Sequence, residues 1–127
     1  MKELSREKYL DIKKCIKQWI ISINEQDKLP EDIVAINFGL FEPYGIELIG
    51  SKQYDAEDDD WACEEDFEPE MRECPNFEID EELDWEYVLE IITNILKKLV
   101  HELSNIEILN VKHITTGFCD GDLVVIK

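Results

Sequence analysis

The chain has 127 residues, of which 44% are hydrophobic, and this is enough to bury one core in a single domain spanning residues 1–127 without disulfides or a metal. Its 31 acidic and 13 basic residues give a formal net charge of −18 at pH 7. A surface this negative repels phosphate backbones and anionic lipids, which excludes nucleic acids and membranes as direct partners and predicts a cationic partner.

We expect a cytoplasmic protein, because no secretory apolar stretch follows the first residues and no run of about 18 apolar residues could span a membrane. Four cysteines are present, and none forms a Cys-x-x-Cys pair. In the cytoplasm we predict free thiols, with Cys15 and Cys119 in the core. A disulfide between Cys63 and Cys74 is the alternative if the compartment is oxidising.

The first predicted element is an amphipathic helix from Ser5 to about Asn24. Ser5 is a favourable N-cap, and Leu4 and Tyr9 flank it in the positions of a hydrophobic staple. Apolar residues then recur at intervals of three and four, as on the buried face of a helix: Ile12, Cys15, Ile16, Trp19, Ile20 and Ile23. We expect this face to contact the core rather than a ligand.

Two strands are predicted next, at residues 33–42 (IVAINFGLFE) and 44–51 (YGIELIGS). Both segments are rich in strand-forming residues and Pro43 separates them, so we interpret the pair as a β-hairpin. Asn37 and Gly39 lie inside the first strand, where a bulge or a close approach of another backbone would explain them.

A second helix is predicted after the acidic region, capped by Asp80 or Asp84 and ended by Ser104 and Asn105. Acidic residues at its start and basic residues near its end suit the helix dipole. Its apolar positions cover more than one stripe: Val88, Leu89, Ile91, Ile92, Ile95, Leu96, Leu99, Val100 and Leu103. A helix this apolar must be covered on more than one side, so we predict that it is the central core helix.

An extended run at residues 106–114 and a final hairpin at residues 114–127, turning at Asp120-Gly121, complete the predicted elements. The order is therefore α, β, β, acidic segment, α, β, β. We predict an α+β domain in which a largely antiparallel sheet packs against two helices.

The acidic segment, defined as residues 54–86, dominates the charge. Between Asp55 and Glu86 it holds 17 acidic residues and one basic residue, Arg72, for a formal charge of −16. Apolar side chains recur through it, unlike in a solvated tail: Trp61, Ala62, Cys63, Phe67, Met71, Phe77, Ile79, Leu83 and Trp85. We predict a partly ordered segment that its aromatic residues attach to the fold, with the carboxylates pointing outward.

No catalytic motif is present. The chain lacks a Gly-rich phosphate loop, a Ser elbow, a His-Glu-x-x-His motif and a His/Cys cluster. His101 and His113 are expected to be structural. We therefore predict a non-enzymatic protein without a cofactor.

A divalent-cation site is the alternative function. Four carboxylates match positions one, three, five and twelve of a calcium loop: Asp55, Glu57, Asp59 and Asp66. The glycine required at position six is Asp60, and the flanking segments are not two helices, which excludes an EF-hand but leaves a looser Ca²⁺ or Mg²⁺ site open. A third interpretation is that the acids only solubilise a long loop.

The blocks INFGLFEPYGIELIGS, YDAEDDDWACEEDF and GFCDGDLVVIK follow one another in this small acidic chain. In this arrangement the chain resembles small acidic immunity proteins of bacterial polymorphic-toxin and contact-dependent systems, which neutralise a cognate toxin. The resemblance extends from Ile36 to the C-terminus. It implies a stoichiometric inhibitor that covers the cationic surface of a basic protein partner.

The positions that would contact such a partner lie at the start of the acidic segment. The carboxylates are Asp55, Asp58, Asp59, Asp60, Glu64, Glu65 and Asp66, and the possible aromatic anchors are Trp61 and Phe67. Charge alone selects the same region. For Trp61 the alternative is that, like Trp85, it attaches the segment to the protein's own body.

Overall fold

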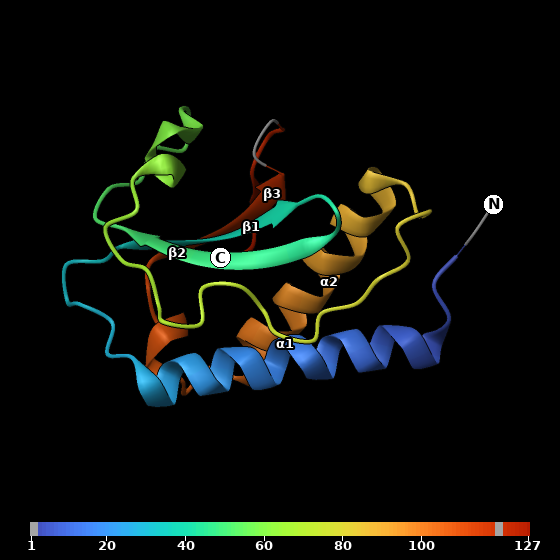
Figure 1. Cartoon of the computed structure of the whole chain (residues 1–127). Helices are drawn as coiled ribbons and strands as arrows, with labels where there is room; N and C mark the ends of the chain where they lie inside the picture. Colours follow the sequence, from blue (N-terminus) through green and yellow to red (C-terminus); the bar gives the residue numbers. More distant parts are fainter. Residues whose placement is uncertain (1–2, 119–120) are drawn as a thin grey trace.

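The computed structural model describes residues 3–118 and 121–127. Within these residues it contains the helices α1 (Arg6–Gln26) and α2 (Trp85–Glu102), the short 3₁₀ helices η1 (Asp59–Cys63) and η2 (Glu107–Leu109), and a four-stranded sheet. The strands are β1 (Ala35–Phe41), β2 (Gly45–Ser51), β3 (His113–Phe118) and β4 (Val124–Val125). Figure 1 shows α1 and α2 on one side of the sheet, and the α+β class is confirmed.

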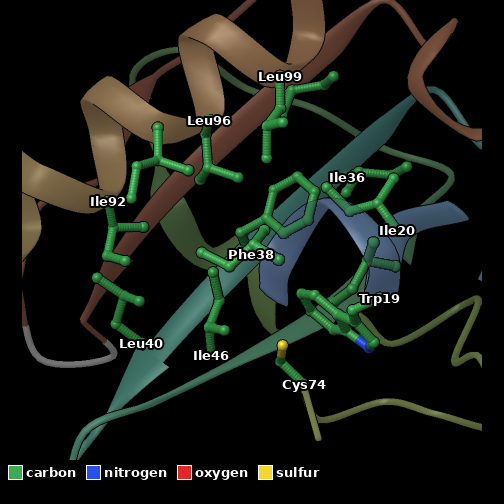
Figure 2. Packing of buried hydrophobic residues seen from close by; sticks show 14 of the residues in the cluster. Trp19, Ile20, Ile36, Phe38, Leu40, Ile46, Cys74, Ile92, Leu96 and Leu99 are labelled. Atoms are coloured by element: carbon green, nitrogen blue, oxygen red, sulfur yellow. The ribbon is translucent and has the colours of Figure 1, made fainter. Parts of the chain in front are cut away.

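One hydrophobic core fills the space between the helices and the sheet. Alternate residues of β1 face it, and Phe38 lies at its centre, with its ring edge-to-face against Trp19 at a centroid distance of 6.1 Å. Figure 2 shows Phe38 between side chains of α1, such as Ile20, and side chains of α2, such as Leu96. Each large apolar side chain buried in this way stabilises the fold by about 1.5–3 kcal/mol.

Helix α1 confirms the first predicted element. The Ser5 hydroxyl accepts a hydrogen bond from the backbone N–H of Lys8 at 3.1 Å, as an N-cap does. The predicted face is buried except for Cys15, which was expected in the core and is half-buried at its edge. Trp19 Nε1 donates to the Met71 carbonyl at 2.7 Å. The helix ends at Gln26 rather than near Asn24.

Strands β1 and β2 form the predicted hairpin, and they pair without interruption over the whole length of β1. The bulge considered at Asn37 and Gly39 is therefore wrong. A polar residue is tolerated there because Asn37 Oδ1 accepts a hydrogen bond from the Thr115 hydroxyl of β3 at 2.9 Å. Strand β3 thus supplies a hydrogen bond to the side-chain oxygen of Asn37, which explains a polar residue inside an apolar strand.

The strands lie in the order β2-β1-β3-β4, and β1 with β3 is the one parallel pair of the described sheet. After β2 the acidic segment runs back along the sheet and α2 returns, so that β3 starts at the end where β2 stops (Figure 1). A parallel neighbour requires a long crossover of this kind. The predicted sheet, largely antiparallel, is confirmed in this form.

The strand expected at residues 106–114 is wrong for most of its length, because η2 occupies part of it and β3 begins only at His113. Ile108 and Leu109 are adjacent and both buried, whereas successive side chains of a strand point to opposite faces. The Ile108 N–H donates to the Asn24 side chain at 3.1 Å, which attaches η2 to the end of α1.

The final hairpin is present as β3 and β4, which pair Thr115 with Val125 and Thr116 with Val124. Its turn was predicted at Asp120-Gly121, and Asp120 lies outside the described residues.

Helix α2 begins after the N-cap residue Asp84, which makes no side-chain capping hydrogen bond, while the Asp80 carboxylate accepts from the Glu82 N–H in the preceding turn. Six of its residues are buried: Val88, Ile91, Ile92, Ile95, Leu96 and Leu99. All six belong to the hydrophobic core, and Figure 2 shows Ile92, Leu96 and Leu99 pointing from α2 toward the sheet, which agrees with the predicted central core helix. In the described chain neither helix is long and apolar enough to cross a bilayer.

Backbone hydrogen bonds attach residues 67–74 of the acidic segment to the edge of β2. Gly50 and Phe67 exchange two of them, at 2.8 and 3.0 Å, and the Leu48 N–H donates to the Arg72 carbonyl at 2.9 Å. The unpaired edge of β2 is thereby covered. We predicted that aromatic side chains attach the acidic segment to the fold. Backbone pairing with β2 contributes to this attachment as well.

Cys15, Cys63 and Cys74 are free thiols, and Cys119 lies outside the described residues. The alternative disulfide between Cys63 and Cys74 is absent, because Cys63 is exposed on η1 whereas Cys74 is buried. The sulfur near Cys74 is that of the half-buried Cys15, at 3.7 Å. Burial, with Cys15 as a further cause, raises the pKa of the Cys74 thiol well above its usual range.

Oxidation with diamide is expected to join Cys15 to Cys74, since their sulfur atoms need to approach by less than 2 Å to reach the length of a disulfide. Peptide mapping by mass spectrometry after alkylation identifies the product. A Cys63→Ser variant is the control, and the same bridge should form in it. A Cys63–Cys74 bridge as the main product would show that this part of the acidic segment does not lie against α1.

Candidate partner-binding site

The outer face of the sheet is the side opposite the helices. Asn37 and Gly39 point there, because the alternate residues of β1, such as Phe38, point into the core. Residues 54–66, which contain η1, rise from the end of β2 on this side (Figure 1, green). Most of the predicted contact residues therefore lie together, away from both long helices.

Aspartate side chains stabilise the turns of residues 54–66. Asp55 Oδ1 accepts from the Glu57 N–H at 2.9 Å, and Asp58 Oδ1 accepts from the Asp60 N–H at 3.0 Å, where Asp58 is the N-cap of η1. Aspartate favours such turns because its short side chain reaches the backbone two residues on. Asp55 and Asp58 thus have a structural role, beside any role in contacting a partner.

Trp61 packs on its own chain. It is 4% exposed, and its ring centroid lies 5.1 Å from that of Tyr54. The other neighbour of Tyr54 is His113 of β3, which stacks on it at 3.7 Å and 5°. Tyr54 was not singled out from the sequence, although an aromatic residue directly before an acidic run was the available signal. Trp85 is 45% exposed and packs edge-to-face on Phe118.

Asp66 and Phe67 attach the C-terminal end of residues 54–66 to β2. Phe67 is 9% exposed, and its backbone pairs with Gly50. The Asp66 carboxylate accepts from the Lys52 N–H at 2.8 Å and from the Ser51 hydroxyl at 3.4 Å. The two candidate aromatic anchors, Trp61 and Phe67, are thus both buried within the chain, which leaves the carboxylates as the groups that a partner can reach.

Two hollows flank η1. The first, the open hollow, has a volume of about 470 Å³ and is lined mainly by polar residues: Gln53, Tyr54, Asp55, Asp58, Asp60, Trp61 and Glu64. The second, the outer-face cleft, has a volume of about 400 Å³, is more enclosed and lies between η1 and the sheet. Asp59 and Glu65 line it. The predicted carboxylates are therefore divided between two neighbouring sites, and Asp66 belongs to neither lining.

Arg72 is the internal counter-ion of the acidic segment. Its guanidinium contacts Glu47 at 3.1 Å, Glu65 at 2.5 Å and Glu68 at 3.3 Å. The hydrogen bond from Arg72 lowers the pKa of Glu65 below its usual range. In the sequence, Arg72 stands out only as the one basic residue among the acids of this segment. That position was the available signal of its role.

We expect Arg72→Gln to lower the free energy of unfolding by about 1–2 kcal/mol at pH 7, because several carboxylates lose their charged partner. Arg72 depresses the pKa of Glu65 in the folded state, so its stabilisation is present above the unfolded-state pKa near 4.3 and is lost as the pH falls through the folded-state value. Urea denaturation at pH 7 and pH 3 measures both effects.

The matched control is Lys52→Gln, which also removes one positive charge. Its ion pair with Asp32 is exposed, with side chains 55% and 59% accessible, so the loss should stay below about 0.5 kcal/mol. An equal loss in the two variants, or a loss for Arg72→Gln that persists at pH 3, would contradict the role of Arg72.

The carboxylates of the predicted calcium-loop spacing do not converge. Asp55 and Asp66 accept backbone N–H groups of their own surroundings, and Asp59 Oδ2 accepts from the Leu123 N–H at 3.3 Å. Within residues 3–118 and 121–127, no three His, Cys, Asp or Glu side chains are placed to hold a metal ion. The geometry therefore lends no support to the divalent-cation alternative.

Comparisons with protein-family models, with curated proteins and with solved structures found no match to this chain.

Proposed function

We propose that the protein is a non-enzymatic binding protein that neutralises a basic protein partner, in the manner of the small acidic immunity proteins that its sequence resembles. The observation that carries this proposal is an ordered surface of carboxylates, held above the sheet by turns, backbone pairing and buried aromatic rings. A solvating loop requires none of these attachments. A partner that binds rigid carboxylates loses less entropy than one that must order a flexible loop.

The charge balance supports a cationic partner. Among the described residues, Arg72 forms ion pairs with Glu65 and Glu68 of the acidic segment and with the nearby Glu47. Clustered like charges repel one another and destabilise the folded state. Lysine and arginine side chains of a partner would relieve that repulsion, and the same field would raise the encounter rate by about ten- to a thousandfold at low salt.

The docked state would depend on charge-assisted hydrogen bonds rather than on exposed aromatic anchors. Asp60 and Glu64 are exposed residues that line the open hollow. Hydrogen bonds between such carboxylates and cationic side chains are about twice as strong as neutral ones. Trp61 and Phe67 would contribute indirectly, by keeping the carboxylates in place.

The experiment is a pull-down with the tagged protein from lysate of its own cell at low salt, eluted with a salt gradient. We expect one basic protein at near-equal stoichiometry, and we expect its toxic activity to stop at a 1:1 ratio when the purified proteins are mixed. Recovery of no basic protein, or of one whose activity is unaffected at a 1:1 ratio, would contradict the proposed function.

A further inference from the structure

The floor of the outer-face cleft is a pair of glycines. Gly39 of β1 and Gly117 of β3 lie opposite each other in the parallel register, so the sheet carries no side chain at this point. The Asp122 carbonyl and Leu123 cover Gly117, which leaves the open part of the floor at Gly39. Apolar residues line the sides, among them Phe41, Ile49 and Leu123. A volume of about 400 Å³ lies within the range of small-ligand sites, about 300–1,000 Å³.

Asn37 contributes its side-chain amide to the lining of this cleft. The residue is 8% exposed, and its Oδ1 atom is bonded to the Thr115 hydroxyl. Its Nδ2 atom makes no hydrogen bond to a described residue, and it lies 3.7 Å from the position that a Cβ on Gly39 would take. Among the described residues the fully buried side-chain atom without a partner is Thr93 Oγ1, so Asn37 Nδ2 is not enclosed and a group that enters the cleft can reach it.

The amide can serve either as a donor or as an acceptor. The Thr115 hydroxyl can both donate and accept, so a half-turn of the Asn37 amide keeps the bond between them and turns Oδ1 toward the cleft. Asn37 can therefore accept a hydrogen bond from a cationic group placed above Gly39.

The charge of the lining favours a cation. Among the described residues, four carboxylates and one guanidinium line the cleft, a formal net charge of −3: Glu47, Asp59, Glu65, Glu73 and Arg72. Arg72 is bonded to Glu47 and Glu65. Asp59 uses Oδ2 for the Leu123 N–H, and its Oδ1 atom has no hydrogen bond to a described residue.

We propose, on the basis of the function proposed above, that the outer-face cleft receives an arginine side chain of the basic partner. The methylene groups of the arginine pack against Phe41 and Ile49, and the guanidinium donates to Asp59 and to Asn37 Oδ1. Arginine fits better than lysine, because its planar group offers five donors that can meet a carboxylate and an amide at the same time.

The first test is an NMR titration of the full chain with N-acetyl-L-arginine methylamide. The matched probe is the citrulline analogue, which has nearly the same shape without the charge. We expect the arginine probe to shift the backbone signals of Gly39 and Gly117 and the side-chain amide of Asn37, with a dissociation constant on the order of 1 mM. The citrulline probe should bind at least about tenfold more weakly.

Gly39→Val is the blocking variant, because the new side chain would occupy the cleft floor. Its Cβ would stand 3.3 Å from Glu47 Cγ, which belongs to a flexible side chain and can move by a few tenths of an ångström. The affinity for the arginine probe should fall at least about tenfold, with an unchanged circular dichroism spectrum. Asn37→Ala is the second variant, for which we expect a loss of about three- to tenfold.

Equal binding of the two probes, or arginine-dependent shifts confined to Asp60 and Glu64 in the open hollow, would overturn the assignment. A captured partner should dissociate from Gly39→Val at least about tenfold faster than from the wild type. Equal dissociation rates would reject the cleft while the proposed function stands. Binding of the arginine probe in the cleft, without any basic protein captured, would reject the proposed function while the arginine site stands.

Discussion

Replacing Asp58, Asp59 and Asp60 together with asparagine is expected to slow association with the basic partner by about ten- to a hundredfold at low salt. The fold should be retained, because asparagine supplies the same acceptor atom to the Asp60 and Leu123 N–H groups. Removing like charges should leave the stability unchanged or raise it. Stopped-flow measurements at low salt and at about 0.5 M salt test this, since salt should remove most of the difference.

The control is the triple variant Glu25→Gln/Glu31→Gln/Glu90→Gln, which neutralises three exposed carboxylates outside the acidic segment. It changes the net charge equally, so it separates the position of the charge from its total. We expect an association rate within about threefold of the wild type, because these sites are far less concentrated. An association rate that is the same in the aspartate triple variant as in the wild type, and that does not change with salt, would contradict electrostatic steering.

Replacing Ile92 with alanine is expected to lower the free energy of unfolding by about 2–5 kcal/mol. Ile92 is fully buried on α2 and lies beside Leu40 of β1 (Figure 2). Truncation leaves a cavity between helix and sheet, and close-packed surroundings close it only in part. Urea denaturation gives the change, with the slope against denaturant expected to stay constant.

Leu10→Ala is the matched truncation, because Leu10 is 46% exposed on α1. It should cost less than about 1 kcal/mol, since little apolar surface is returned to water. Similar losses in the two variants would show that Ile92 does not lie in the core. Binding of the basic partner should remain normal in folded Ile92→Ala protein, because α2 and η1 lie on opposite sides of the sheet (Figure 1).

Local patterns were sufficient for the elements whose stability is itself local. Ser5 and the spacing from Ile12 to Ile23 predicted α1 to within two residues of its end. The strand-forming residues on both sides of Pro43 predicted the β1–β2 hairpin. Capping and apolar periodicity act over a few residues, so they can be read directly from the chain.

Sequence patterns were not sufficient where a contact with a distant segment decided between two possible local structures. Residues 106–109 have the composition of a strand, yet Asn24, 84 residues from Ile108, binds the backbone of η2. For Trp61 the sequence left two options open, contact with a partner or packing on its own chain. It packs on Tyr54, and Tyr54 stacks on His113 of the distant strand β3. In each case the deciding contact joins residues whose separation along the chain carries no periodic signal.

The amino-acid sequence by itself determined that the chain forms an α+β fold and that its negative charge is concentrated in one segment, because composition and short-range spacing are sufficient for both. Only the tertiary structure decided that Gly39 lies opposite Gly117 next to the pair of Asn37 and Thr115, that Arg72 joins three carboxylates, and that a cleft opens between η1 and the sheet. The glycine pair depends on the parallel pairing of β1 with β3, and the contacts of Arg72 depend on the pairing of the acidic segment with β2. Both pairings join segments that are distant along the chain, so no local pattern predicts them.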